Sequence, residues 1–236
     1  MKLQCLFPWI LTILCVLTIQ LHAATDEELY NKHWAEGDRY SAEGKWDKAA
    51  ASFTKAIKYY PALPANYGSY VNRANAYSML GKLDLALKDY NKVLDAFPDK
   101  SVKELGEVYY NRGEAYKRNK KPALAIPDYE KAIAIDSEIK SVHNNLAWLL
   151  ATCSDAKVRD GAKAIKYALI ACEKTDHKNA SYLDTLGAAY AEAGDFENAT
   201  LTQKKALELE TNAEDKADLA TRLALYEKKM AYHKAE

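Results

Sequence analysis

The stretch that decides the fold is residues 37–61, GDRYSAEGKWDKAAASFTKAIKYYP. Small and aromatic residues recur in it at fixed distances: Tyr40 lies nine residues before Ala49, and Ala56 lies seven residues after it. Gly44 stands five residues before Ala49, where a glycine can end one helix in the left-handed conformation and reverse the chain. The stretch therefore predicts two antiparallel helices joined by a tight turn.

The same frame recurs along the chain. The central alanine reappears with spacings of 37, 39, 39 and 35 residues, and a tyrosine stands nine residues before it in four of the five copies. The fourth copy keeps the alanines, but extra residues in 154–161 lengthen its inner loop. Such a recurrence is typical of a solenoid of stacked helix pairs. The alanines are Ala49, Ala86, Ala125, Ala164 and Ala199.

The pattern resembles the tetratricopeptide repeat (TPR), whose signature consists of small, aromatic, Gly, Ala, aromatic, Ala and Pro positions. The resemblance implies an all-α fold: an α-solenoid of tandem antiparallel helix hairpins, the TPR superhelix, with a C-terminal capping helix. We expect five repeats within residues 26–213, then the capping helix and tail at 214–236. The repeats are expected at about 30–63, 67–100, 106–139, 140–178 and 180–213, and the signature residues of the first are Gly37, Tyr40, Gly44, Ala49, Phe53, Ala56 and Pro61.

The third repeat departs from the pattern at two positions. Lys120 stands where the turn glycine belongs. Pro127 falls inside the second helix, where it removes a backbone donor and favours a bend. We expect irregular curvature at this repeat.

Two repeats carry an arginine and an aspartate at positions where the others have neither. Arg73 and Arg112 replace the usual leucine of the first helix, and Asp89 and Asp128 stand sixteen residues later in the same two repeats. The other three repeats have neither residue. This joint presence predicts an arginine–aspartate bridge between the two helices of a repeat, with a structural rather than a catalytic role.

The first 23 residues read differently from the rest of the chain. Lys2 is the only formal charge before Asp26, and residues 6–19 are nearly all apolar. This layout is typical of a bacterial secretory signal, and the apolar run is shorter than the roughly 20 residues of a membrane span. We expect residues 1–23 to be a signal peptide, with an uncleaved anchor as the alternative. Either reading predicts an exported chain, periplasmic or secreted, that meets the membrane only through this segment.

Composition and charge exclude several classes of function. Lysine plus arginine equals aspartate plus glutamate at 33 each, so no overall field favours nucleic acid as a partner. The histidines show no metal-ligand spacing, and no GxSxG motif, phosphate loop or dinucleotide-binding glycine turn occurs. We therefore expect no cofactor, no metal and no enzymatic activity.

Two cysteines remain beyond the expected signal. Cys153 ends one predicted helix, and Cys172 lies some 16 Å along the axis of the next. A disulfide requires α-carbons within about 7 Å. The spacing therefore predicts two buried thiols.

Asparagines provide the clearest candidate binding residues. Because the first helices of such repeats line the concave side of the solenoid, a row of side-chain amides there can pair with the backbone of an extended peptide. The row resembles the asparagine ladders of peptide-holding tetratricopeptide repeats. The alternative is that these amides only satisfy neighbouring backbone groups, and both readings stay open. Asn72, Asn111 and Asn145 share one repeat position, and Asn75 and Asn144 lie close by.

Aromatic and basic residues extend this candidate surface. Trp34, Tyr110 and Arg118 fall near the concave face in the repeat frame, although core packing is the alternative for each. The basic clamp by which some repeats hold a terminal carboxylate is excluded, because Trp34, Asp38 and Glu107 stand where it needs lysine and arginine. The same frame predicts Tyr70, Lys117 and Trp148 near this face.

These observations predict a non-catalytic protein–protein interaction scaffold or adaptor, which binds a partner protein or extended peptide on the concave surface. One alternative is a substrate-recognition subunit of an envelope enzyme or assembly complex. Another is a small-molecule or lipid carrier. A carrier requires an apolar pocket, a space that the alanines and tyrosines are expected to fill.

Overall fold

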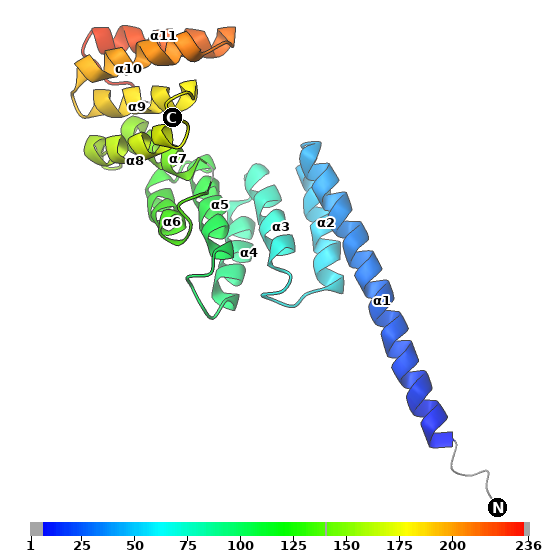
Figure 1. Ribbon diagram of the computed structural model, residues 1–236. Helices are drawn as coiled ribbons and strands as arrows, with labels where there is room; N and C mark the ends of the chain where they lie inside the picture. Colours follow the sequence, from blue (N-terminus) through cyan, green and yellow to red (C-terminus); the bar gives the residue numbers. More distant parts are fainter. Residues whose placement is uncertain (1–6, 140, 234–236) are drawn as a thin grey trace, which may run out of the picture. The chain divides into compact units, whose positions relative to one another are not determined.

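The computed structural model describes residues 7–139 and 141–233, with side chains from residue 25 onward. Within these residues every regular element is an α-helix, and consecutive helices pack as antiparallel pairs (Figure 1). The expected all-α solenoid of helix hairpins is therefore confirmed. The chain divides into two compact units, Met1–Lys100 and Ser101–Glu236.

The first unit contains two hairpins. Helix α1 packs on α2, α2 on α3, and α3 on α4. The helices are α1 (Phe7–Ala42), α2 (Trp46–Tyr59), α3 (Tyr67–Met79) and α4 (Leu83–Ala96). α1 is continuous through residues 23 and 24, where the sequence predicts the end of a signal peptide.

The second unit contains three hairpins and a last helix. α11 packs on α10 and α9 and occupies the position expected for the capping helix. The helices are α5 (Glu104–Arg118), α6 (Pro122–Ile135), α7 (Val142–Thr152), α8 (Gly161–Glu173), α9 (Ala180–Glu192), α10 (Phe196–Leu209) and α11 (Ala213–Glu227). Within the part of the chain that the structure describes, no helix has the length and apolar content to cross a membrane.

The turns inside the hairpins take the left-handed conformation that the repeat frame predicts. Gly44, Gly81 and Gly194 have φ values of 69°, 71° and 82°. Lys120 takes the same conformation, with φ of 56°, at the turn between α5 and α6. The turn therefore keeps its geometry where the glycine is missing. The cost is backbone strain, because the Cβ of a residue other than glycine crowds the carbonyl oxygen in this conformation. α6 continues through Pro127 as a single helix.

Small residues let the paired helices approach each other closely. The five repeat alanines are all fully buried. An added Cβ on Gly37 would lie 2.6 Å from the Phe53 ring, so only glycine fits against that ring. The buried alanines and the aromatic side chains beside them thus form the core that the spacing predicts.

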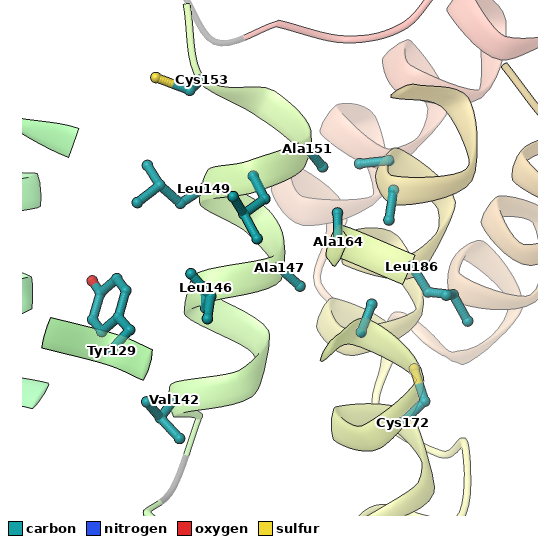
Figure 2. Close-up of a cluster of buried hydrophobic side chains, with 14 of the residues drawn as sticks. Tyr129, Val142, Leu146, Ala147, Leu149, Ala151, Cys153, Ala164, Cys172 and Leu186 are labelled. Atoms are coloured by element: carbon teal, nitrogen blue, oxygen red, sulfur yellow. The ribbon is translucent and has the colours of Figure 1, made fainter. Parts of the chain in front are cut away.

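The largest core cluster belongs to the second unit. Figure 2 shows Leu146 along α7, with Tyr129 of α6 on one side and Ala164 of α8 and Leu186 of α9 on the other. Their side chains are at most 4% exposed. These contacts join consecutive hairpins into one packed body, as a solenoid requires.

The two cysteines lie at opposite ends of this cluster (Figure 2). Both are free and buried, which confirms the prediction of two thiols. Burial raises the pKa of Cys172 to about 11, so its thiol stays protonated and unreactive near neutral pH.

Candidate binding surface

Arginine–aspartate pairs join the two helices of one hairpin in each unit. Arg73 on α3 donates from Nε and Nη2 to the two carboxylate oxygens of Asp89 on α4, at 2.7 and 2.8 Å. Arg112 on α5 donates in the same way to Asp128 on α6, at 2.7 and 2.6 Å. The predicted bridges are confirmed, and their bidentate geometry fixes how the helices of each hairpin face each other.

A second contact repeats in the same two hairpins. The hydroxyl of Tyr90 donates to Asn75 Oδ1 in the first unit, and the hydroxyl of Tyr129 donates to Glu114 Oε1 in the second. Both tyrosines are fully buried. Burial raises the pKa of Tyr129, and the neighbouring Glu114 charge raises it further. Asn75, a candidate ligand-binding residue, is therefore at least partly used inside its own hairpin.

The asparagines at the shared repeat position reach toward the preceding first helix. Asn72 donates to Asp38 Oδ1 on α1 at 3.3 Å. Asn145 on α7 donates to Glu114 Oε1 at 2.8 Å and to the Tyr110 hydroxyl at 3.0 Å, both on α5. Two members of the expected row thus link first helices of the same unit, a role close to the alternative given above. The partners are side chains rather than backbone groups.

Asn111 is placed differently from Asn72 and Asn145. It is half-buried and lines a cavity of about 510 Å³ in the second unit, together with Tyr110. The cavity lies between the start of α5 and residues 136–139, which follow α6. Its wall combines charged and polar groups with a nearly equal share of apolar surface. The lining residues are Lys103, Glu107, Tyr110, Asn111, Asp136, Glu138 and Ile139.

We call Tyr110, Asn111, Glu114, Asn145 and Trp148 the first-helix surface of the second unit. Tyr110 is at its centre: its hydroxyl accepts from Asn145, and its ring lies 6.0 Å from that of Tyr129. Burial raises the pKa of Tyr110 to about 12, and the Glu114 charge adds to this effect. The hydroxyl is neutral near pH 7 and retains a proton that it can donate to a ligand.

The remaining predicted residues are scattered. Trp34 is half-buried on α1 and packs against the Ala49, Phe53 and Ala76 cluster, which is the core-packing alternative. Asn144 is buried, and its Oδ1 has no hydrogen-bond partner. Arg118 is exposed at the end of α5. The structure therefore brings together Tyr110, Asn111 and Asn145.

The last hairpin contains a polar cluster that sequence reasoning missed. Asp184 on α9 is 6% exposed and accepts from Gln203 Nε2 on α10 and Arg222 Nε on α11, each at 2.7 Å. Burial raises the pKa of Asp184, while the Arg222 charge opposes this shift. Arg222 therefore fastens the capping helix to the hairpin before it.

Glu114 and Asp38 were also missed as partners of the asparagines. Both stand at one frame position, three residues after the asparagine position of their own repeats. A search for a carboxylate there and an asparagine in the next repeat would have found both pairs.

Among the described residues, no cluster of three or more His, Cys, Asp or Glu could hold a metal ion.

The fold and these surfaces define a helical-hairpin solenoid with polar first-helix faces. Three family profiles, each described as tetratricopeptide repeat, match residues 35–101, 106–138 and 180–212, which together are more than half of the chain. The chain belongs to the tetratricopeptide-repeat family. Proteins of this family generally mediate protein–protein interactions, and the scaffold is typically non-catalytic.

Solved structures share this fold. MamA is 23% identical with a TM-score of 0.60, over 81% of this chain and 96% of MamA. YrrB, described as a TPR protein with an unusual peptide-binding site, is 17% identical with a TM-score of 0.59, over 80% and 90%. PilW, a type IV pilus biogenesis factor, is 20% identical with a TM-score of 0.65, over 85% and 86%. No curated protein sequence matches the chain.

Proposed function

We propose that the chain is a non-catalytic scaffold or adaptor that binds a partner protein or an extended peptide on the first-helix surface of the second unit. The observation that carries this proposal is the cavity beside Tyr110 and Asn111. An amide there supplies two donors and one acceptor, which matches the alternating polar groups of a peptide backbone. The Tyr110 hydroxyl supplies a further donor.

Hydrogen bonds between neighbouring side chains hold this surface in a fixed arrangement. Asn145 holds both Tyr110 and Glu114, and Glu114 also accepts from Lys117 Nζ at 2.7 Å. Side chains held in this way lose little further conformational entropy when a ligand binds. Charged and polar side chains in the wall of the cavity can pair with a peptide backbone, which a wholly apolar ligand such as a lipid could not use.

The test is a crosslinking pull-down that compares the unchanged chain with an Asn111→Leu variant. Leucine keeps the size of the side chain and removes its donors and acceptor. Loss of two hydrogen bonds predicts at least about tenfold weaker capture of the partner. Asn31→Leu, on the exposed surface of α1, is the matched control and should capture the partner normally.

Circular dichroism would verify that both variants are folded. A partner that Asn111→Leu captures as well as the unchanged chain does would move the binding site away from this cavity. Loss of capture by both leucine variants would indicate a general effect of the substitution rather than a site.

We also propose that the chain is exported, on the strength of the sequence pattern in residues 1–23. The test is to express the full chain in a bacterium and to compare periplasmic and cytoplasmic fractions. Replacing Leu11 and Leu14 with arginine should keep the chain in the cytoplasm, because charges interrupt the apolar segment. Equal fractionation of the two chains would contradict export.

A further inference from the structure

The chain reverses direction directly after the capping helix. Lys229 adopts the left-handed conformation, with φ of 56°. Lys229 N donates to Tyr226 O at 2.9 Å, and Met230 N donates to Leu225 O at 3.0 Å. This closure ends α11 and turns the following segment back toward the helices that precede it. We call residues 228–233 the C-terminal tail.

The tail ends on the first helices of the last two hairpins. The Tyr232 ring lies 6.1 Å from the ring of Trp148 on α7. His233 Nε2 lies 2.7 Å from Glu192 Oε2 at the end of α9. Tyr232 and His233 thus contact different side chains: Tyr232 contacts an aromatic residue, and His233 contacts an acidic one.

Arg222 completes the aromatic part of this contact. Its guanidinium carbon lies 5.6 Å from the centre of the Trp148 ring and 5.5 Å from that of Tyr232. Both distances are within the range of a cation–π interaction. Arg222 is held in place by Asp184, so this aromatic site is fixed by a buried ion pair.

The acidic side chain is fixed in a similar way. Glu192 uses its other oxygen, Oε1, to accept from Arg159 Nε at 2.9 Å. The carboxylate is therefore held with one oxygen directed to the tail. A peptide with an aromatic residue next to a basic one would therefore complement the Trp148 ring and the Glu192 carboxylate.

Trp148 belongs to the first-helix surface of the second unit, so the tail covers part of the surface to which we assign partner binding. Much of the tail is open to solvent: Lys228, Lys229 and Met230 are exposed, and the His233 side chain is 40% exposed. Beyond the backbone bonds that close α11, its contacts come from its last three described residues. Ala231 and Tyr232 pack on the buried cluster that contains Ala191 and Tyr226, and His233 contacts Glu192. A segment of this kind can leave without unfolding α11.

We propose that the site formed by Trp148, Arg222 and Glu192 binds a peptide segment with an aromatic residue followed by a basic one, and that the C-terminal tail occupies this site until such a partner displaces it. The inference rests on the proposed function and names the chemistry of the partner. Because the tail is tethered, its local concentration is in the millimolar range, and a free peptide must compete with it.

The experiment uses a fluorescein-labelled peptide with the chain's own sequence KKMAYHKAE, residues 228–236, added to the full chain. Anisotropy should show about tenfold tighter binding to a Tyr232→Ala chain than to the unchanged chain, as expected if the tail fills the site in roughly nine molecules of ten. Adding Trp148→Ala to that variant should abolish binding. A peptide with alanine in place of its tyrosine is the matched control and should not bind.

A second variant keeps the test decisive even if the Trp148→Ala chain does not fold. Glu192→Gln in the Tyr232→Ala chain keeps the size of the side chain and should weaken peptide binding several-fold. Equal peptide binding by the unchanged and Tyr232→Ala chains, or no binding to either, would overturn the proposal. Neither result would alter the Asn111 pull-down, so the two proposals can fail separately.

Discussion

The α3–α4 hairpin and the α9–α10 hairpin each bury a carboxylate, and they neutralise it from different places. Asp89 receives two hydrogen bonds from Arg73 within its own hairpin. Asp184 receives its arginine from α11, outside the hairpin. An interior hairpin therefore satisfies its own charge, whereas the last hairpin depends on the helix that follows it. The capping helix supplies a counter-charge as well as covering apolar surface.

The largest effect should follow from a charge placed in the packing that all hairpins share. Ala125→Glu buries a carboxylate at a fully buried position, which should destabilise the chain by more than about 4 kcal/mol. Thermal unfolding followed by circular dichroism would measure it. Leu124→Glu, one residue away and 49% exposed, is the control and should change little. An unchanged melting temperature for Ala125→Glu would refute the repeat register.

Removing the arginine of the capping helix tests the dependence of the last hairpin. Arg222→Ala leaves Asp184 buried without its ionic partner, which should cost about 3 kcal/mol in urea denaturation at pH 7. Adding Asp184→Asn should recover part of the loss, because the unpaired charge is gone. If the double variant is as unstable as the single one, the buried charge is not the cause.

The same variant should show a defined pH dependence. Burial raises the pKa of Asp184, so the proton binds more tightly in the folded state than in the unfolded state. The stability contributed by that proton is present below the unfolded pKa near 4 and is lost as pH rises through the folded pKa. The deficit of Arg222→Ala should therefore shrink toward pH 4. A deficit that stays constant between pH 4 and pH 7 would contradict this reading.

A conservative substitution in the α3–α4 hairpin tests whether its ion pair needs the bidentate geometry or only the charge. Arg73→Lys keeps the charge but cannot make the bidentate contact with Asp89, so a loss of about 1 kcal/mol is expected. Arg39→Lys, whose side chain is 62% exposed, is the control and should have no effect in the same denaturation experiment. Equal stability of the Arg73→Lys and unchanged chains would show that charge alone suffices.

The smallest effect should come from exchanging two turn residues. Lys120→Gly removes a side chain from a left-handed position and should stabilise the chain by about 0.5 to 1 kcal/mol. Gly81→Lys places the same strain in the α3–α4 turn and should have the opposite sign. Two shifts of the same sign in chemical denaturation would contradict the interpretation.

Features that obey a fixed spacing could be predicted from the sequence. The repeat, the turn glycines and the Arg73–Asp89 bridge all lie within one frame, because helix geometry sets which residues of a hairpin face each other. Lys120 was recognised as a departure from that frame. Its left-handed conformation shows that the surrounding hairpin, rather than the residue, determines the turn.

The candidate site was less accessible to sequence reasoning. The shared position of Asn72, Asn111 and Asn145 follows from the repeat frame, but their different surroundings depend on which side chains the neighbouring elements present. Arg222, which pairs with Asp184, and Tyr232, which contacts Trp148, both lie beyond the last repeat, where no spacing constrains them. The binding roles of the asparagines and of the Trp148 site stay predictions.

Glu114 has a consequence for how this sequence can evolve. One carboxylate serves Tyr129 from its own hairpin, Lys117 from its own helix and Asn145 from the next hairpin. A change at residue 114 therefore removes the acceptor from three donors at once. Residues 114, 129 and 145 should change together among descendants of this gene, while positions such as 118 can drift independently.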